Sequence, residues 1–155
     1  MSQSPVTSVS TGPEQVSCQV LVPAEASVIF DLVADPHRHP ELDGSGTVRA
    51  RDVKGPDRLS VGAKFGVGMK MYGIPYAITS TCTALEDDHL VEWQHPMGHL
   101  WRWEFESAGP GMTMVTETFD YSTTKIPAVI RLTKTDQKNK VGITKTLEAL
   151  VARFA

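Results

Sequence analysis

The sequence predicts an α+β fold in which a curved antiparallel β-sheet of about seven strands wraps around a long C-terminal α-helix. Strand-like segments joined by short turns occupy most of the chain, two short helical segments follow the first strand, and helical spacing returns near the C-terminus. Strands that follow one another through short turns form an antiparallel meander, whose apolar face needs a cover. The C-terminal helix is the predicted element long enough to supply this cover, and 155 residues fit one domain.

The N-terminal segment, residues 1–14, is rich in Ser, Thr, Pro and Gly, so we expect a flexible tail before a single domain at residues 15–155. The segment lacks the basic start and apolar core of a secretory signal, and no apolar run reaches the roughly 18 residues of a bilayer span. Cys18 and Cys82 lie in strand-like runs without metal-ligand spacing, which predicts buried, reduced thiols and a cytoplasmic location.

The elements are expected in the following order. Residues 16–22 alternate apolar and polar side chains, as a strand does, until Pro23 ends the pattern. Residues 24–34 repeat apolar side chains at helical spacing, and prolines reduce residues 35–42 to a short helical turn. Six further strands are predicted at residues 46–53, 63–71, 76–85, 90–95, 99–107 and 112–121.

The C-terminal helix is predicted from Pro127 onward, because proline is tolerated in a first helical turn. Residues 133–140 are polar throughout, which predicts a bend or an excursion into solvent. The apolar stripe that would face the sheet follows and consists of Ile143, Leu147, Leu150, Val151 and Phe154.

The short turns predict the strand register. If the turn 96–98 is flanked by His95 and His99, Trp93 pairs with Trp101. If the next turn is flanked by Ser107 and Gly111, Trp101 pairs with Glu117. Both turns place the same side chains on the inner face of the sheet: Phe65, Val67, Met69, Met71, Tyr76, Ile78, Ser80, Cys82, Trp93, His95, His99, Trp101, Trp103, Phe105, Val115, Glu117, Phe119 and Tyr121.

Large aromatic side chains and methionines with a few polar groups are typical of a small-molecule pocket, although the same residues could simply fill a core. The predicted ligand contacts are Phe65, Met69, Met71, Tyr76, Ile78, Trp93, His95, His99, Trp101, Trp103, Glu117 and Phe119.

Glu117 is the most informative of these residues, because a carboxylate on an apolar face needs a partner or a proton. It could orient a ligand or exchange protons together with His95 or His99, which makes these three residues the candidate catalytic groups. It could instead be a structural group held by the Trp101 indole N–H, a histidine or a tyrosine hydroxyl. A register slip of one residue would turn Thr116 and Thr118 inward in its place.

Three segments carry a resemblance to a known family: residues 22–36 at the opening strand and helix, residues 61–65 at the entry to the third strand, and residues 139–150 in the last helix. They look like the corresponding segments of the helix-grip superfamily, also called SRPBCC, which includes START-type lipid-transfer domains and polyketide cyclase/dehydrase-like proteins. The resemblance covers residues 15–154 and implies a helix-grip fold with an internal cavity. It leaves the function open, because the family contains carriers, cyclases, dehydrases and hormone receptors.

The first functional hypothesis is the binding or carrying of a small hydrophobic molecule such as a lipid, polyketide or aromatic metabolite. The alternatives are a cyclase/dehydrase-type enzyme that uses Glu117 with a histidine, and a protein-interaction module with an exposed apolar patch. We expect no metal, since His37, His39, His95 and His99 are joined by no cysteine and the resembling family is not generally metal-dependent, and we expect no cofactor.

The net charge of −3 and the pI near 5.9 give no general attraction to nucleic acid, and no stable membrane insertion is expected. The lysines of the last helix are interpreted as a solvated face, and a homodimer is left open. These lysines are Lys134, Lys138, Lys140 and Lys145.

Overall fold

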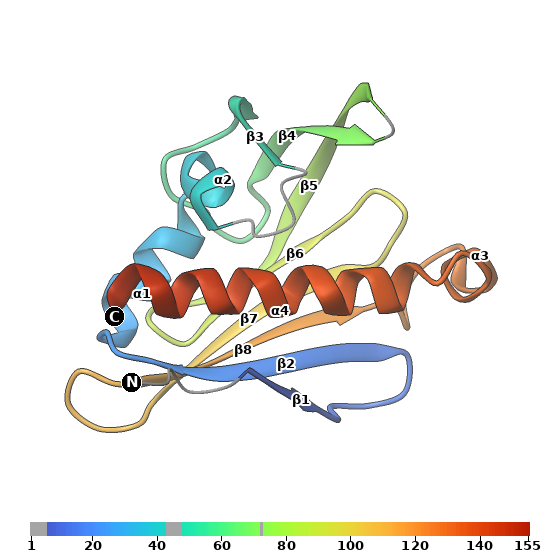
Figure 1. Cartoon of the computed structure of the whole chain (residues 1–155). Helices are drawn as coiled ribbons and strands as arrows, with labels where there is room; N and C mark the ends of the chain where they lie inside the picture. Colours follow the sequence, from blue (N-terminus) through green and yellow to red (C-terminus); the bar gives the residue numbers. More distant parts are fainter. Residues whose placement is uncertain (1–5, 43–47, 72) are drawn as a thin grey trace.

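One antiparallel sheet of eight strands forms the body of the protein in the computed structural model, which describes residues 6–42, 48–71 and 73–155, with the backbone alone described at 48–52 and 69–71. The strands are β1 (Thr7–Val9), β2 (Gln15–Val22), β3 (Val48–Lys54), β4 (Lys64–Met71), β5 (Ile74–Glu86), β6 (Leu90–Gln94), β7 (Leu100–Ser107) and β8 (Thr113–Asp120). Their order across the sheet is β1-β2-β8-β7-β6-β5-β4-β3. The predicted α+β meander is therefore confirmed (Figure 1).

Strand β1 lies in the segment for which the sequence predicted a flexible tail. Thr7 pairs with Gln19 and Val9 pairs with Ser17, so β1 covers the outer edge of β2. An uncovered edge strand exposes a row of unpaired backbone groups, and β1 satisfies part of that row. The tail prediction is wrong for these three residues, and β1 raises the strand count above the predicted seven.

The described residues also form five helical segments: α1 (Ala26–Ala34), the 3-10 turn η1 (Pro36–Arg38), α2 (His39–Leu42), α3 (Pro127–Leu132) and α4 (Thr135–Phe154). The predicted bend in the C-terminal helix is a complete break, because Lys134 adopts the left-handed conformation with a φ of 56°. No helix among the described residues has the length and hydropathy of a membrane span.

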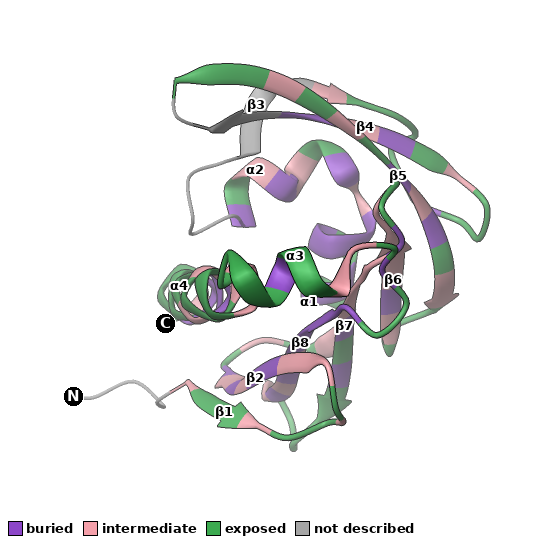
Figure 2. Ribbon diagram, turned by 90° about the vertical axis from the view of Figure 1, so that its right-hand side faces the viewer, coloured by how far each residue is buried: buried purple, intermediate pink, exposed green. Residues whose placement is uncertain are grey.

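Helix α4 covers only part of the sheet. Its buried residues Ile143, Leu147, Leu150 and Val151 face the sheet, and the helix packs chiefly against β2 and β8. Helix α1 packs against β6 and β7, while α2 packs against β3. Figures 1 and 2 show α4 lying across one half of the curved sheet, with the β3–β5 half rising away from it.

The register of the central strands confirms one turn prediction and corrects the other. Trp93 pairs with Trp101 as predicted. Between β7 and β8, however, Trp101 pairs with Phe119 and Trp103 pairs with Glu117. The turn is closed by a hydrogen bond from the Ala108 N–H to the Met112 carbonyl, and not by the predicted pair of Ser107 and Gly111. The predicted pairing between β7 and β8 is therefore shifted by two residues. Because this shift is an even number, each side chain stays on its predicted face of the sheet.

Candidate functional site

The inner face of the sheet, on the α4 side, divides into a buried part and a half-exposed part. Phe65, Trp103, Phe105, Glu117 and Phe119 are buried, as parity predicted. The half-exposed side chains are Tyr76, Ile78, Trp93, His95, His99 and Trp101. The side chains of Met69 and Met71, two predicted ligand contacts, lie outside the described residues.

One aromatic group joins α2 to the sheet. The His39 ring stacks on Trp93 with 4.9 Å between ring centroids, and Phe65 meets both rings edge-on at 5.5 and 5.6 Å. Nε2 of His39 donates to the Val33 carbonyl at 2.7 Å, and burial lowers the pKa of His39, although the Val33 bond acts in the opposite sense. His39 is therefore a neutral, flat side chain that continues the aromatic surface. Sequence reasoning missed this role, since no local pattern brings α2 onto β6.

A second aromatic group surrounds the turn between β6 and β7. His95 and His99 stack with 4.1 Å between centroids and 20° between ring planes. Phe119 lies 5.2 Å from His99 and 5.0 Å from Trp101, again between centroids. The structure thus brings together four of the residues that the sequence singled out. We call His95, His99, Trp101 and Phe119 the histidine group.

Both histidines of this group are held neutral. The Met97 N–H donates to His95 Nδ1 at 3.0 Å, so the neutral His95 ring carries its proton on Nε2. Burial lowers the pKa of His95, and burial followed by the neighbouring His95 lowers the pKa of His99 to about 4. His99 Nδ1 is buried and has no hydrogen-bond partner in the described part of the chain. The pair can offer hydrogen bonds to a neutral ligand without bringing a positive charge.

The turn that carries the pair is fixed to the segment before α3. The Lys125 N–H donates to the Met97 carbonyl at 2.8 Å, and the Thr123 hydroxyl donates to the Gly98 carbonyl at 2.6 Å. Gly98 has a φ of 101°, and a Cβ added there would lie 2.6 Å from the Thr123 carbonyl oxygen. Only glycine fits this close approach, so the backbone itself positions the histidine pair.

Glu117 stands apart from both histidines. It is buried, opposite Trp103 on β7 and Cys18 on β2. Four residues of extended strand separate Trp103 from His99, which corresponds to roughly 13 Å. The register therefore does not bring Glu117 and His99 together as an acid/base pair.

Partly buried histidines that stay neutral make stability depend on pH. The unfolded chain protonates His99 near pH 6.5, while the folded protein resists protonation until about pH 4. Unfolding therefore takes up protons in this window, and the free energy of unfolding should fall as pH drops from 6.5 to 4, with His99 contributing about 1–2 kcal/mol after allowance for its partial exposure. Urea titrations at several pH values check this loss.

The matched variants for this test are His99→Phe and His89→Phe. The first keeps a ring in the histidine group and should reduce the loss of stability at low pH. The second makes the same substitution at an exposed histidine outside the histidine group and serves as the control. Equal pH profiles for wild type and His99→Phe would contradict the assignment.

The other candidate groups are simpler. Both cysteines are free and buried, as predicted, and burial raises the pKa of the Cys82 thiol. Across residues 6–42, 48–71 and 73–155, no group of three or more His, Cys, Asp or Glu side chains is arranged to hold a metal ion.

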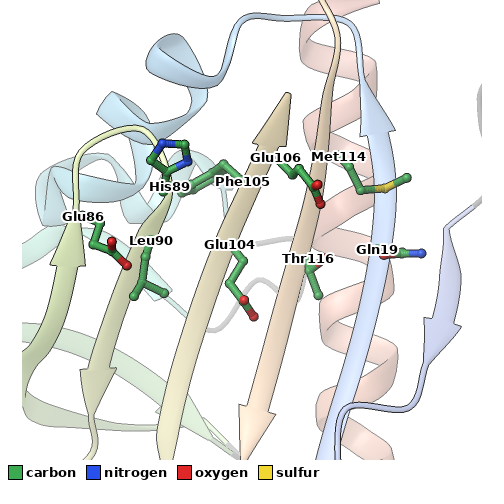
Figure 3. A pocket seen from close by; sticks show the side chains of 9 residues that line it. All are labelled: Gln19, Glu86, His89, Leu90, Glu104, Phe105, Glu106, Met114 and Thr116. Carbon is green, nitrogen blue, oxygen red and sulfur yellow. The ribbon is translucent and has the colours of Figure 1, made fainter. Parts of the chain in front are cut away.

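A pocket of about 340 Å³ lies on the opposite, outer face of the sheet (Figure 3). Its lining residues are Gln19, Glu86, His89, Leu90, Glu104, Phe105, Glu106, Met114 and Thr116. Glu104 and Glu106 are exposed there, as parity predicted. Three carboxylates make this a strongly acidic surface, unlike the aromatic inner face.

Comparison with known proteins gives three kinds of likeness. Residues 13–155 match the family described as "Polyketide cyclase / dehydrase and lipid transport". The chain is 50% identical over 154 residues to "Uncharacterized protein Rv0088" of Mycobacterium tuberculosis, covering 97% of this chain and 68% of that protein.

Two solved structures share the fold at low identity. A START superfamily protein from Mycobacterium smegmatis has a TM-score of 0.68 at 16% identity, covering 90% of this chain and 96% of that one. Ginseng major latex-like protein 151 from Panax ginseng has a TM-score of 0.62 at 13% identity, with coverage of 90% and 96%. Both likenesses concern the fold alone.

Proposed function

Since the chain belongs to the polyketide cyclase/dehydrase and lipid transport family, we propose that it binds and carries a small hydrophobic molecule on the inner face of its sheet. The fold is a hydrophobic ligand-binding fold. The proposed site is the half-exposed part of the inner face, between the histidine group and the β4–β5 side of the sheet.

The observation that carries this proposal is the partial exposure of large apolar side chains on the inner face of the sheet, beside the area that helix α4 covers. Tyr76, Ile78, Trp93 and Trp101 point to the side of the sheet that normally forms a core, yet each keeps accessible surface. Helix α4 does not cover them, because it packs chiefly against β2 and β8. An apolar ligand in this position would gain about 25 cal/mol for each Å² of apolar surface removed from water.

The histidine group suggests the chemistry of the ligand. His95 offers an Nε2–H donor, and His99 has a buried Nδ1 that lacks a partner in the described structure. Neutral imidazoles favour an uncharged hydroxyl or carbonyl group over a carboxylate or an amine. We therefore expect a mainly apolar ligand with a neutral oxygen at the end that faces the β6–β7 turn.

Binding is better supported than catalysis. The enzymatic alternative needs a carboxylate within hydrogen-bond reach of an imidazole or of a bound substrate's reacting atoms. The β7–β8 register places Glu117 opposite Trp103, well away from the histidine pair. No observation on this face favours proton transfer between these groups.

The test is a titration with a dansyl-labelled long-chain alcohol, followed by energy transfer from the inner-face tryptophans. We expect saturable binding with a single class of site. Ile78→Lys places a charge on the proposed site and should weaken binding at least tenfold, which is about 1.4 kcal/mol.

Thr79→Lys places the same charge at an exposed position on the outer face of the same strand and should leave the affinity within twofold of wild type. Circular dichroism checks that both variants fold. The absence of saturable transfer, or equal affinities for the two variants, would contradict the proposed site. Native mass spectrometry of protein purified from cells then identifies the natural ligand by its mass.

A further inference from the structure

The end of the molecule at α3 exposes several large apolar side chains. Leu132 is 83% exposed, Val129 is 49% exposed and Met97 is 37% exposed. Val129 and Leu132 stand three residues apart on α3 and so share one side of the helix, while Ile130 is buried. Met97 belongs to the same end, because its carbonyl accepts the Lys125 N–H just before α3 begins. We call Met97, Val129 and Leu132 the α3 tip.

The segment that contains α3 and the start of α4 is rich in exposed basic residues. Residues 123–141 contain five basic residues and one acidic residue, a net charge of +4. The whole chain carries −3, so the remainder carries −7. The five basic residues are Lys125, Arg131, Lys134, Lys138 and Lys140, and all are exposed. Only Arg131 is engaged in an ion pair in the described structure, with Glu14 at 2.8 Å.

The combination of exposed apolar side chains and a basic segment fits one kind of partner. We propose that the α3 tip docks the protein onto the surface of an anionic lipid bilayer. Leu132, Val129 and Met97 enter the boundary between headgroups and acyl chains, and the basic residues bind lipid phosphates. Each basic residue near an anionic surface contributes about fivefold to membrane affinity, and the shallow apolar contacts add to this.

The charge distribution also sets the orientation of the protein on the bilayer surface. The acidic remainder of the chain is repelled by an anionic surface, so only the α3 end approaches it. A protein partner is less well matched, since a typical interface core is depleted of lysine and here a small apolar centre lies in a lysine-rich segment. A single-stranded nucleic acid would be bound largely by stacking on exposed aromatic side chains, and the α3 tip contains none.

Docking at this end would bring the histidine group close to the bilayer. The β6–β7 turn carries both His95 and His99 and is bonded to the segment that leads into α3. Figure 2 looks at this end and shows α3 largely exposed, in front of α4 and the central strands. Membrane docking does not require a ligand on the inner face, so either proposal can fail while the other holds.

The experiment is cosedimentation of the full chain with two kinds of vesicle. One kind is phosphatidylcholine alone, and the other contains one third phosphatidylglycerol. We expect binding to the anionic vesicles, at least tenfold weaker binding to the neutral ones, and a decline as salt is raised. Leu132→Glu should reduce binding to the anionic vesicles at least tenfold, and its exposed position makes a folding defect easy to exclude by thermal melting.

Two matched controls complete the design. Val61→Glu introduces the same charge at an exposed valine away from the α3 tip and should reduce binding no more than twofold. Lys134→Glu should reduce binding at least fivefold, while Lys145→Glu, further along α4, should have a smaller effect. No binding to anionic vesicles, or equal binding by Leu132→Glu and Val61→Glu, overturns the proposal. Self-association that Leu132→Glu abolishes, without vesicle binding, also overturns it in favour of a protein interface.

Discussion

Replacing Phe119 with alanine is expected to lower the free energy of unfolding by about 3–5 kcal/mol, because a fully buried aromatic ring would leave a large cavity. Phe119 is 0% exposed and contacts the rings of His99, Trp101 and Tyr121. A domain of this size has about 5–15 kcal/mol of stability in total, so the loss would be a large share of it. Urea unfolding followed by tryptophan fluorescence measures the change.

The matched variant is Phe119→Leu. Leucine keeps most of the apolar volume but not the flat ring, so the expected cost is smaller, about 1–2 kcal/mol. The near-ultraviolet circular dichroism of Trp101 should change in both variants, since both lose the ring that Trp101 touches. A loss below 1 kcal/mol in the alanine variant would show that the histidine group can repack without Phe119.

Replacing Gly98 with alanine is expected to lower the free energy of unfolding by about 3–4 kcal/mol, from the backbone conformation and from a clash. Gly98 has a φ of 101°, and its new Cβ would lie 2.6 Å from the Thr123 carbonyl oxygen. Relief of the clash would pull the turn away from the segment before α3. Histidine NMR signals of His95 and His99 should therefore shift as well.

The variant Gly109→Ala separates the cost of the backbone conformation from the cost of the clash. Gly109 has a similar φ of 117°, but a Cβ added there would meet no atom within 4 Å. We expect a loss of about 1–2 kcal/mol and unchanged signals for His95 and His99. Equal losses for the two glycine variants would mean that the approach to Thr123 does not hold the turn.

Local sequence patterns were sufficient for the order of elements and for the two faces of the sheet. Alternation along a strand depends only on neighbouring residues, so an error in pairing that spans an even number of residues leaves the faces correct. This is why Glu117 and Phe119 were placed on the inner face although their partners on β7 were misassigned. The Gly-Pro-Gly turn permits more than one closure, and the sequence did not distinguish between them.

The candidate site depends on contacts that no local pattern contains. His39 reaches Trp93 only because α2 folds back over the sheet, and Thr7–Val9 form a strand only because β2 offers an edge. The partial exposure of Trp93 and Trp101 depends on where α4 lies across the sheet. Side-chain type alone was compatible with a filled core as well as with a pocket, and the pocket was favoured only through the family resemblance.

Because α4 covers only one half of the sheet, the two halves differ in how much they contribute to folding stability. Strands β2 and β8 make most of the contacts with the helix, so substitutions on these strands should mainly lower the folding stability. Tyr76 and Ile78, at the half-exposed part of β5, carry less of that packing, so a change in their size should cost less stability than a change at buried inner positions such as Phe65 and Val91. If the proposed function holds, ligand preference can therefore change at the half-exposed positions while the buried positions keep the protein folded.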